Sequence, residues 1–172
     1  MDKAPVEIKD KVNFICYKED GSIPLPSGSL DIICSKGVLT YVKNKRALFK
    51  EFFRLLNPSG EIFLVDWLVP EEQESRHEML PLGEMAFKET ESFYHKILRD
   101  CGFRNIRFKN KSVEYLGYVK NLILKLDSRE HRDNFSEIIE PSFREKIIQA
   151  ELKLQTSIER KEQFSVLIRA NI

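Results

Sequence analysis

Residues 30–67 decide the fold, and they read LDIICSKGVLTYVKNKRALFKEFFRLLNPSGEIFLVDW. The stretch opens with a short apolar run, Leu30–Cys34, which is typical of a strand buried on both faces of a parallel sheet. Apolar side chains then recur at helical spacing and predict an amphipathic helix over Lys45–Leu56. That helix ends at residues 57–60, NPSG, because proline cannot continue it and glycine supplies a positive φ. Since Glu61–Trp67 is a second apolar strand, the stretch predicts a right-handed βαβ unit of a doubly wound α/β sheet.

The segments that flank this unit predict further elements. Val12–Tyr17 is β-branched and aromatic and predicts a short strand, and a loop rich in proline and glycine follows it. Glu71–Lys88 is polar, and we expect it to form a helical excursion over the edge of the sheet. Thr90 is expected to cap the next helix, which ends at Gly102, where glycine suits a left-handed backbone.

The rest of the chain predicts a pair of helices between two strands. Phe103–Phe108 and Phe164–Ala170 are the strands, and Glu114–Leu126 and Pro141–Arg160 are the helices. We expect a single domain over residues 1–172. It consists of a sheet with flanking helices over 12–109, a helical insertion over 110–163 and the last strand over 164–172.

Composition excludes several classes of protein. The formal net charge is +1, so no global field attracts nucleic acid or an anionic membrane. No apolar stretch is long enough to span a bilayer, and the first residues lack the apolar region of a secretory signal. Cys16, Cys34 and Cys101 match no metal-ligand or redox spacing, and we expect them to be buried free thiols in a reducing cytosol. The sequence therefore predicts a cytoplasmic protein without a metal site.

Three turns resemble those of the class I S-adenosylmethionine-dependent methyltransferases. Residues 23–33, IPLPSGSLDII, are similar to the family segment usually written LPFPDNSFDVV. Residues 57–60 are similar to the KPGG turn before the family's fifth strand, and residues 101–103 to its AGF turn before the sixth. Each motif is common by itself, whereas their order and spacing are specific. The resemblance implies an incomplete Rossmann-like sheet that lacks the first strands, and S-adenosylmethionine as the cofactor.

Within that family the chain resembles the phosphoethanolamine N-methyltransferases most. Residues 35–41, SKGVLTY, align with their SRDxILH segment, and residues 65–67, VDW, with their TDY. Ligands of an open α/β sheet bind beyond the carboxyl ends of its strands. The resemblance therefore implies cofactor contacts from Glu19, Asp20, Ser35, Lys36 and Gly37, and substrate contacts from Asp66, Trp67 and Tyr115. Four of these residues have other readings, since Glu19 and Asp20 could solvate a loop and Asp66 could cap the next segment, while Tyr115 could belong to the core.

The sequence departs from the family in both halves of the site. We expect a truncated domain, because the glycine-rich ExGxGxG loop that approaches the cofactor is not found in the sequence. Tyr41 stands at the position of the family's catalytic histidine, and tyrosine is a poor base because its ordinary pKa is about 10. Glu84 and Ala86 fall where the family clamps a phosphate, and a carboxylate repels that group. A phosphobase substrate is therefore disfavoured.

Two functions are compatible with these departures. The first is S-adenosylmethionine-dependent methyl transfer to a small-molecule acceptor, with the cofactor half supplied by a separate chain or lost. The second is a catalytically inactive remnant that acts as a binding or dimerisation module. In both, the strand at residues 30–34 becomes an open edge, which we expect a second copy, a partner chain or the N-terminal segment to cover. The remaining alternative is an unrelated α/β protein with coincidental turns.

Overall fold

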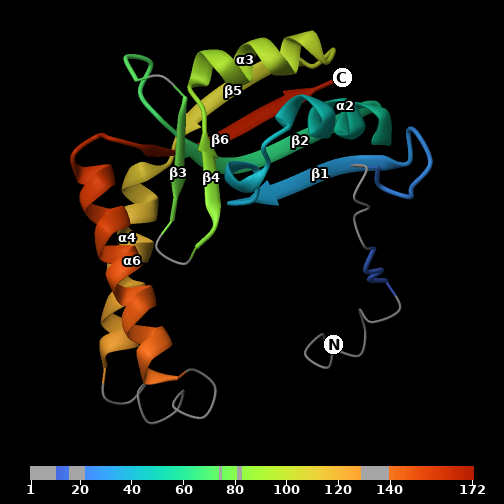
Figure 1. Ribbon diagram of the computed structural model, residues 1–172. Helices are drawn as coiled ribbons and strands as arrows, with labels where there is room; N and C mark the ends of the chain where they lie inside the picture. Colours follow the sequence, from blue (N-terminus) through green and yellow to red (C-terminus); the bar gives the residue numbers. More distant parts are fainter. Residues whose placement is uncertain (1–10, 16–21, 74, 81–82, 129–139) are drawn as a thin grey trace.

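The main sheet of the protein has four strands, with the last strand in its interior. The computed structural model describes residues 11–15, 22–73, 75–80, 83–128 and 140–172. The strand order is β1 (Leu30–Lys36), β2 (Leu56–Leu68), β6 (Phe164–Asn171) and β5 (Arg104–Asn110), as Figure 1 shows. β1 and β2 are parallel, whereas β6 is antiparallel to both β2 and β5. β1 therefore forms one edge of the sheet.

The predicted βαβ unit is present. α2 (Lys45–Leu55) connects β1 to β2, and the Asn44 side chain caps it by accepting a hydrogen bond from the Ala47 N–H at 3.1 Å. The predicted turn at residues 57–60 lies inside β2 as an irregular segment, because Leu30 pairs with Leu56 but Ile32 pairs with Glu61. Beyond this irregularity the two strands stay in register up to Lys36.

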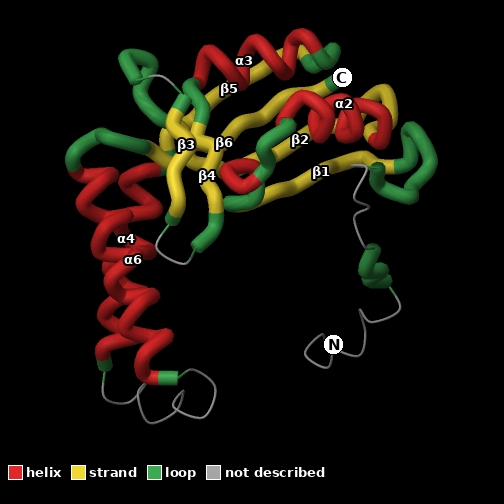
Figure 2. Tube along the Cα trace, in the orientation of Figure 1, coloured by secondary structure: helices red, strands yellow, loops and turns green. Residues whose placement is uncertain are grey.

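The hydrophobic core lies between the sheet and two helices on one of its faces. α3 (Glu91–Asp100) lies on the same face as α2, as Figures 1 and 2 show. The Thr90 hydroxyl oxygen accepts from the Phe93 N–H at 3.2 Å, which confirms the predicted cap, and Gly102 follows the helix with a φ of 103°. Alternate residues of β2 point into this layer, together with apolar residues of the helices and of β6: Phe49, Ile62, Leu64, Leu68, Tyr94, Leu98, Val166 and Ile168.

The opposite face of the sheet is open near β1. Ile32 is 56% exposed and Cys34 is also exposed, so the predicted burial of this strand on both faces is wrong. Side chains of a strand alternate between faces, and α2 and α3 cover only one of them. The prediction of buried thiols is accordingly correct for Cys101 and wrong for Cys34, while Cys16 lies outside the described residues.

Residues 76–88 form a β-hairpin, so the helix predicted over Glu71–Lys88 is wrong. β3 (Arg76–Met79) pairs antiparallel with β4 (Met85–Lys88), and Gly83 has a φ of 96° between them. Ala86 and Lys88 of β4 are buried, and the Lys88 ammonium donates to Glu78 of β3 at 2.6 Å. The two-residue periodicity of burial and this cross-strand ion pair favour a strand over a helix.

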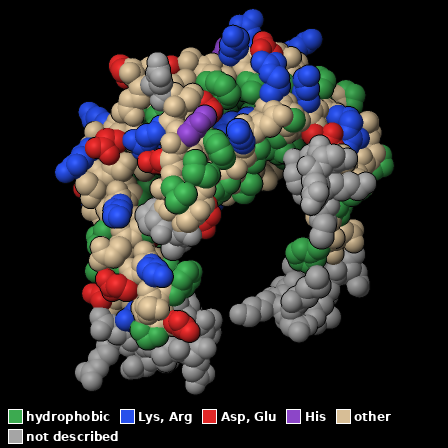
Figure 3. All heavy atoms as spheres, viewed as in Figure 1, with side chains coloured by type: hydrophobic (Ala, Val, Ile, Leu, Met, Phe, Trp, Pro, Cys, Tyr) green, Lys and Arg blue, Asp and Glu red, His purple; other side chains and the backbone are tan. Residues whose placement is uncertain are grey.

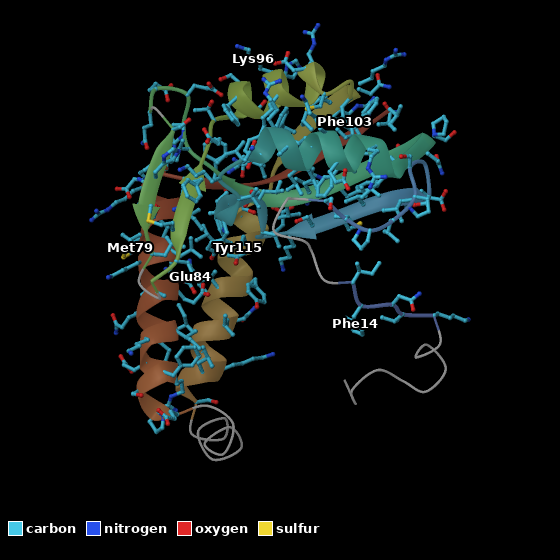
Figure 4. All side chains as sticks on the ribbon, turned by 45° about the vertical axis from the view of Figure 1, so that its right-hand side comes forward. Phe14, Met79, Glu84, Lys96, Phe103 and Tyr115 are labelled. Atoms are coloured by element: carbon cyan, nitrogen blue, oxygen red, sulfur yellow. The ribbon has the colours of Figure 1, made fainter. Side chains whose placement is uncertain are left out.

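The strand predicted over Val12–Tyr17 is absent from the part of that segment that the structure describes. Residues 12–15 are irregular, and Phe14 is 77% exposed, as Figure 4 illustrates. An extended segment needs a neighbouring strand for its backbone groups, and the described sheet offers none to these residues. Residues 16 and 17 lie outside the described residues.

Two long helices form the predicted insertion between β5 and β6. α4 (Ser112–Asp127) and α6 (Pro141–Glu159) pack against each other and project from one end of the sheet as an arm (Figures 1 and 2). The base of the arm is joined to β6, since the Lys111 N–H donates to the Ser165 carbonyl at 2.7 Å and the Ser165 N–H donates to the Ser112 hydroxyl at 3.1 Å. Among the described helices, none has the length and apolar character needed to cross a membrane.

Candidate functional site

The polypeptide turns sharply where β1 ends, at the edge of the sheet where α/β folds bind ligands. Gly37 follows β1 with a φ of 66°, and its N–H donates to the Val65 carbonyl of β2 at 2.8 Å. The short 3-10 helix η1 (Leu39–Tyr41) comes next and carries Tyr41 at its end. The ends of β1 and β2 thus hold η1 beside Asp66 and Trp67, the residues that lie near the end of β2.

A buried carboxylate anchors η1 to the sheet. Asp66 is 1% exposed, and its two oxygens accept from the Thr40 hydroxyl at 2.5 Å and from the Tyr94 hydroxyl at 3.1 Å. Burial raises the pKa of Asp66, and the hydrogen bonds from Thr40, the Trp67 backbone and Tyr94 oppose that rise. Because these partners occupy both oxygens, Asp66 positions the neighbouring Tyr41 and does not face a bound ligand in this conformation.

A buried lysine fixes the segment that follows η1. Lys45 is 2% exposed, and its ammonium donates to the carbonyls of Val42 at 2.9 Å and Phe87 at 2.7 Å. Burial lowers the pKa of Lys45, while the charges of Asp66 and Glu89 raise it. Lys45 therefore ties the β3–β4 hairpin to the turn beyond β1, and this places the hairpin tip beside the site.

Aromatic rings gather on the open face beyond the strand ends. The ring of Trp67 meets that of Tyr115 edge to face at a centroid distance of 4.7 Å, and Tyr115 meets Tyr118 at 5.6 Å. The Lys36 ammonium lies 5.3 Å from the centroid of the Tyr118 ring, within the range of a cation–π contact. We call Trp67, Tyr115 and Tyr118 the aromatic cluster. It joins the end of β2 to the first turns of α4.

One carboxylate flanks the aromatic cluster, and two others flank Tyr41. Burial raises the pKa of Tyr115 to about 12, and the charge of Glu151 on α6 adds to this rise. Burial also raises the pKa of Tyr41, with contributions from Glu84 and Asp66. Figure 4 shows Glu84 at the tip of the β3–β4 hairpin and Tyr115 at the start of α4. Negative charge therefore approaches Tyr115 from the arm and Tyr41 from the hairpin.

The structure brings most of the predicted site residues together and reveals others. Lys36, Gly37, Tyr41, Trp67 and Tyr115 lie at or beside the cluster, Ser35 is half-buried in β1, and Glu19 and Asp20 lie outside the described residues. Sequence reasoning missed Thr40, Tyr94, Tyr118 and Glu151. Tyr118 follows Tyr115 by three residues and so lies on the same side of α4, which the helical spacing could have shown. Glu151 comes from a helix far away in the sequence and left no comparable signal.

Surface hollows also lie beside α3. Two open hollows of about 670 and 600 Å³ flank α3 and share Glu71, Ser92 and Lys96. Glu71 there accepts from the Ser92 N–H at 2.8 Å and from its hydroxyl at 2.6 Å, so it caps the helix. Because none of the predicted site residues lines these two hollows, we take the aromatic cluster as the candidate site. No group of three histidine, cysteine, aspartate or glutamate side chains within the described ranges is placed to hold a metal ion.

The comparisons with known proteins agree on one family. A methyltransferase-domain family matches residues 2–64, which include the turns at 23–33 and 57–60. Phosphoethanolamine N-methyltransferase 1 of Zea mays is 20% identical over 146 residues, which are 83% of this chain and 28% of that protein. The solved structure of phosphoethanolamine N-methyltransferase 2 of Haemonchus contortus superposes with a TM-score of 0.71 at 12% identity, over 87% of this chain and 35% of the other.

The fold is shared with an enzyme of another kind. A cyclopropane synthase from Mycobacterium tuberculosis superposes with a TM-score of 0.68 at 14% identity, over 85% of this chain and 56% of that one. The chain spans 28% of the first curated relative and 35% of the first solved one. Its mixed α/β fold nevertheless matches those structures over most of its own length. The chain is therefore similar to the class I S-adenosylmethionine-dependent methyltransferases, in sequence over residues 2–64 and in fold over most of its length, with distant similarity to the phosphoethanolamine N-methyltransferases.

Proposed function

We propose that this chain provides the acceptor side of an S-adenosylmethionine-dependent methyltransferase and directs methyl transfer to a small molecule once a cofactor-binding half is present. The observation that carries the proposal is the aromatic cluster with its flanking carboxylates at the carboxyl ends of β1 and β2, in a methyltransferase fold. Positioning contributes much of the acceleration in a displacement between two bound reactants. A rigid site for the acceptor is therefore a substantial part of such an enzyme.

The residues after β1 fit a cofactor at this position. A Cβ added to Gly37 would meet nothing within 4 Å, so a ligand can approach the backbone there. Ser35 and Lys36 precede it at the end of the strand, and we assign cofactor contacts to these three residues and to Glu19 and Asp20. S-adenosylmethionine supplies an activated methyl group on its sulfonium. The chain's own residues hold and orient the acceptor.

Tyr41 is assigned a positioning role. Burial and the nearby charges of Glu84 and Asp66 raise the pKa of Tyr41, so its hydroxyl keeps its proton at neutral pH. A protonated hydroxyl can donate a hydrogen bond to an acceptor but does not serve as a general base. Without a general base at this position, the chain also fits the alternative function, an inactive remnant that binds a ligand or a partner. A histidine in place of Tyr41 would be the better base.

The open edge and face beside β1 are the proposed contact with the completing half. β1 is an edge of the described sheet, and the exposed side chains of Ile32 and Cys34 lie on the face opposite α2. Phe63 of β2 pairs with Cys34 and extends this apolar face. Unpaired strand edges and apolar faces of this kind are normally covered. We propose that a strand pairs with β1 and a helix packs on Ile32, Cys34 and Phe63, contributed by a partner chain or a second copy.

Complementation tests the proposal. The chain is titrated calorimetrically with S-adenosylmethionine, alone and mixed with a glycine-rich upstream half encoded nearby. We expect binding and methyl transfer to small amines only in the mixture. Mutation Asp100→Asn, on the exposed end of α3, should leave both unchanged. Binding without transfer would support a ligand-binding remnant, and the absence of both in the mixture would overturn the proposal.

A further inference from the structure

Lys36 places a positive charge on the face of the most exposed ring of the aromatic cluster. Its ammonium lies 5.3 Å from the centroid of Tyr118, which is 52% exposed, and Lys36 itself is exposed. Tyr115 stands next to Tyr118 and is in turn packed against Trp67. Tyr118 is therefore exposed to solvent at the end of a packed row of rings, and a cation already lies over it.

The charges around the rings also favour a cation. Glu151 lies close enough to Tyr115 to affect its ionisation, and its Oε2 atom is buried without a hydrogen-bond partner among the described residues. Glu84 approaches Tyr41 from the hairpin. Two lysines of this region are paired with carboxylates, since Lys111 pairs with Glu114 at 2.6 Å and Lys120 of α4 with Glu159 at 3.6 Å. An anion such as phosphate meets carboxylates here, whereas a cation is attracted.

Lys36 is a weakly held occupant of this position. Exposed cation–π contacts are among the weak interactions in proteins, and a lysine loses rotamer freedom when its chain is held over a ring. A lysine ammonium is also strongly hydrated. A methylated ammonium group carries the same charge with an apolar surface, which is the kind of cation that aromatic cages recognise. Such a ligand can displace Lys36 from the ring.

We propose that Tyr115 and Tyr118, supported by Trp67, form a binding site for a small methylated ammonium compound, and that Lys36 occupies this site until the ligand displaces it. The inference rests on the proposed function in one respect, since it takes this ammonium compound to be the methyl acceptor or its product. Lys36 then acts as an internal competitor. Its removal strengthens ligand binding, whereas removal of the Tyr118 ring weakens it.

Trp67 makes the test direct, because it is the single tryptophan of the chain and belongs to the cluster. Its fluorescence is followed while tetramethylammonium chloride is added to the full chain, with sodium chloride as the ionic-strength control. We expect a saturable change, tightened about threefold in Lys36→Met and weakened about fivefold or more in Tyr118→Leu. Tyr118→Phe keeps the ring and should bind about as tightly as the unaltered chain.

A matched lysine separates local competition from a general effect of charge. Lys120→Met removes the same charge from α4 at a residue that pairs with Glu159 and has no described ring contact, so the affinity should not change. Equal tightening in Lys36→Met and Lys120→Met would overturn the role of Lys36. Saturable binding of inorganic phosphate in place of tetramethylammonium would overturn the ligand class. Circular dichroism of each variant identifies any that fail to fold. If Tyr118→Leu does not fold, the affinities of Tyr118→Phe and Lys36→Met are compared instead.

The two proposals fail separately. The titration needs neither a cofactor nor a completing half, so a lack of tetramethylammonium binding would remove this inference and leave the methyl-transfer test intact. Failure of methyl transfer with ammonium binding retained would leave a binding module.

Discussion

At the scale of single residues, Asp66 shows how one side chain can organise a site that it does not enter. Its position at the end of β2 suggested a substrate contact or a cap, yet both oxygens accept hydrogen bonds from Thr40 and Tyr94. Removing water from a carboxylate disfavours its charged form, and the pKa of Asp66 is raised accordingly. The hydrogen bond to Thr40 fixes η1, which in turn sets the place of Tyr41.

The raised pKa of Asp66 predicts a specific dependence of stability on pH. The folded protein holds this proton more tightly than the unfolded chain, whose carboxyl has the ordinary value of 3.8. Ionisation of Asp66 therefore costs no stability well below pH 3.8, and the cost grows as the pH rises towards the folded-state pKa. In Asp66→Asn this cost is absent, so the free energy of unfolding of the variant should rise relative to the unaltered chain across that interval. Urea unfolding at a series of pH values measures it.

Asp100 supplies a control with the opposite sign. Its hydrogen bond with Arg46, at 2.8 Å, lowers the pKa of this exposed carboxyl. The carboxylate therefore contributes stability above its ordinary pKa that is lost as the pH falls through the lowered one. Asp100→Asn should lose stability relative to the unaltered chain as the pH rises, by a small amount because the pair is exposed. If both variants changed in the same direction, the assignment of Asp66 as the buried, destabilised charge would be wrong.

At the scale of elements, the turn between α3 and β5 requires glycine for two reasons. Gly102 has a φ of 103°, and a Cβ there would lie 2.7 Å from the Phe53 ring. That ring cannot easily yield, because it packs edge to face on Phe103 at a centroid distance of 5.5 Å. The turn thus brings the end of α3 close to Phe53 of α2.

Gly102→Ala should therefore lower the free energy of unfolding by about 1–3 kcal/mol, through backbone strain and overpacking. Gly117→Ala is the matched control, because Gly117 lies inside α4 and an added Cβ would meet nothing within 4 Å. Alanine is the better helix former, so this variant should gain about 0.5–1 kcal/mol. Chemical denaturation of both variants measures these changes. A loss at Gly117 as large as at Gly102 would show that the effect comes from any added methyl group.

At the scale of the whole molecule, the described chain has one covered and one open face. α2 and α3 cover one face of the sheet. The α4–α6 arm projects from one end of the sheet, away from these two helices, as Figure 1 shows. The space-filling view of Figure 3 shows lysine and arginine side chains spread over the upper surface of the molecule. The aromatic cluster lies where the arm meets the strand ends. A site in this position is bounded on one side by the chain and needs a further element to enclose a ligand.

Cys34 on the open face can report whether that element binds. In a Cys16→Ser background, a thiol reagent should react quickly with the exposed Cys34 and slowly with Cys101, which is buried and whose pKa burial raises. Addition of the completing half should slow the reaction of Cys34 at least tenfold while leaving Cys101 unchanged. Slowing that depends on the concentration of the chain alone would identify a second copy as the partner. An unchanged rate in the presence of an active completing half would contradict the proposed covering of Cys34.

The sequence alone determined those features that depend on short stretches of the chain. The periodicity of apolar residues predicted α2, α3, α4 and α6, and the glycine after α3 and the cap at Thr90 were also correct. The turns at residues 23–33 and 57–60 indicated the similarity to methyltransferases, and both lie within the residues that match a methyltransferase-domain family. These signals are local, because helix spacing, strand composition and turn chemistry are properties of neighbouring residues.

Only the tertiary structure decided which faces are covered and which side chains meet. Residues 76–88 form a hairpin, and Cys34 is exposed. Asp66 accepts hydrogen bonds from Thr40 of η1 and Tyr94 of α3. The tertiary structure also brought Lys36 of β1 to Tyr118 of α4, and Glu151 of α6 to Tyr115. Burial and such contacts arise between segments far apart in the chain, so no local pattern encodes them. The family was readable from turns, whereas the ligand chemistry of the site came from packing.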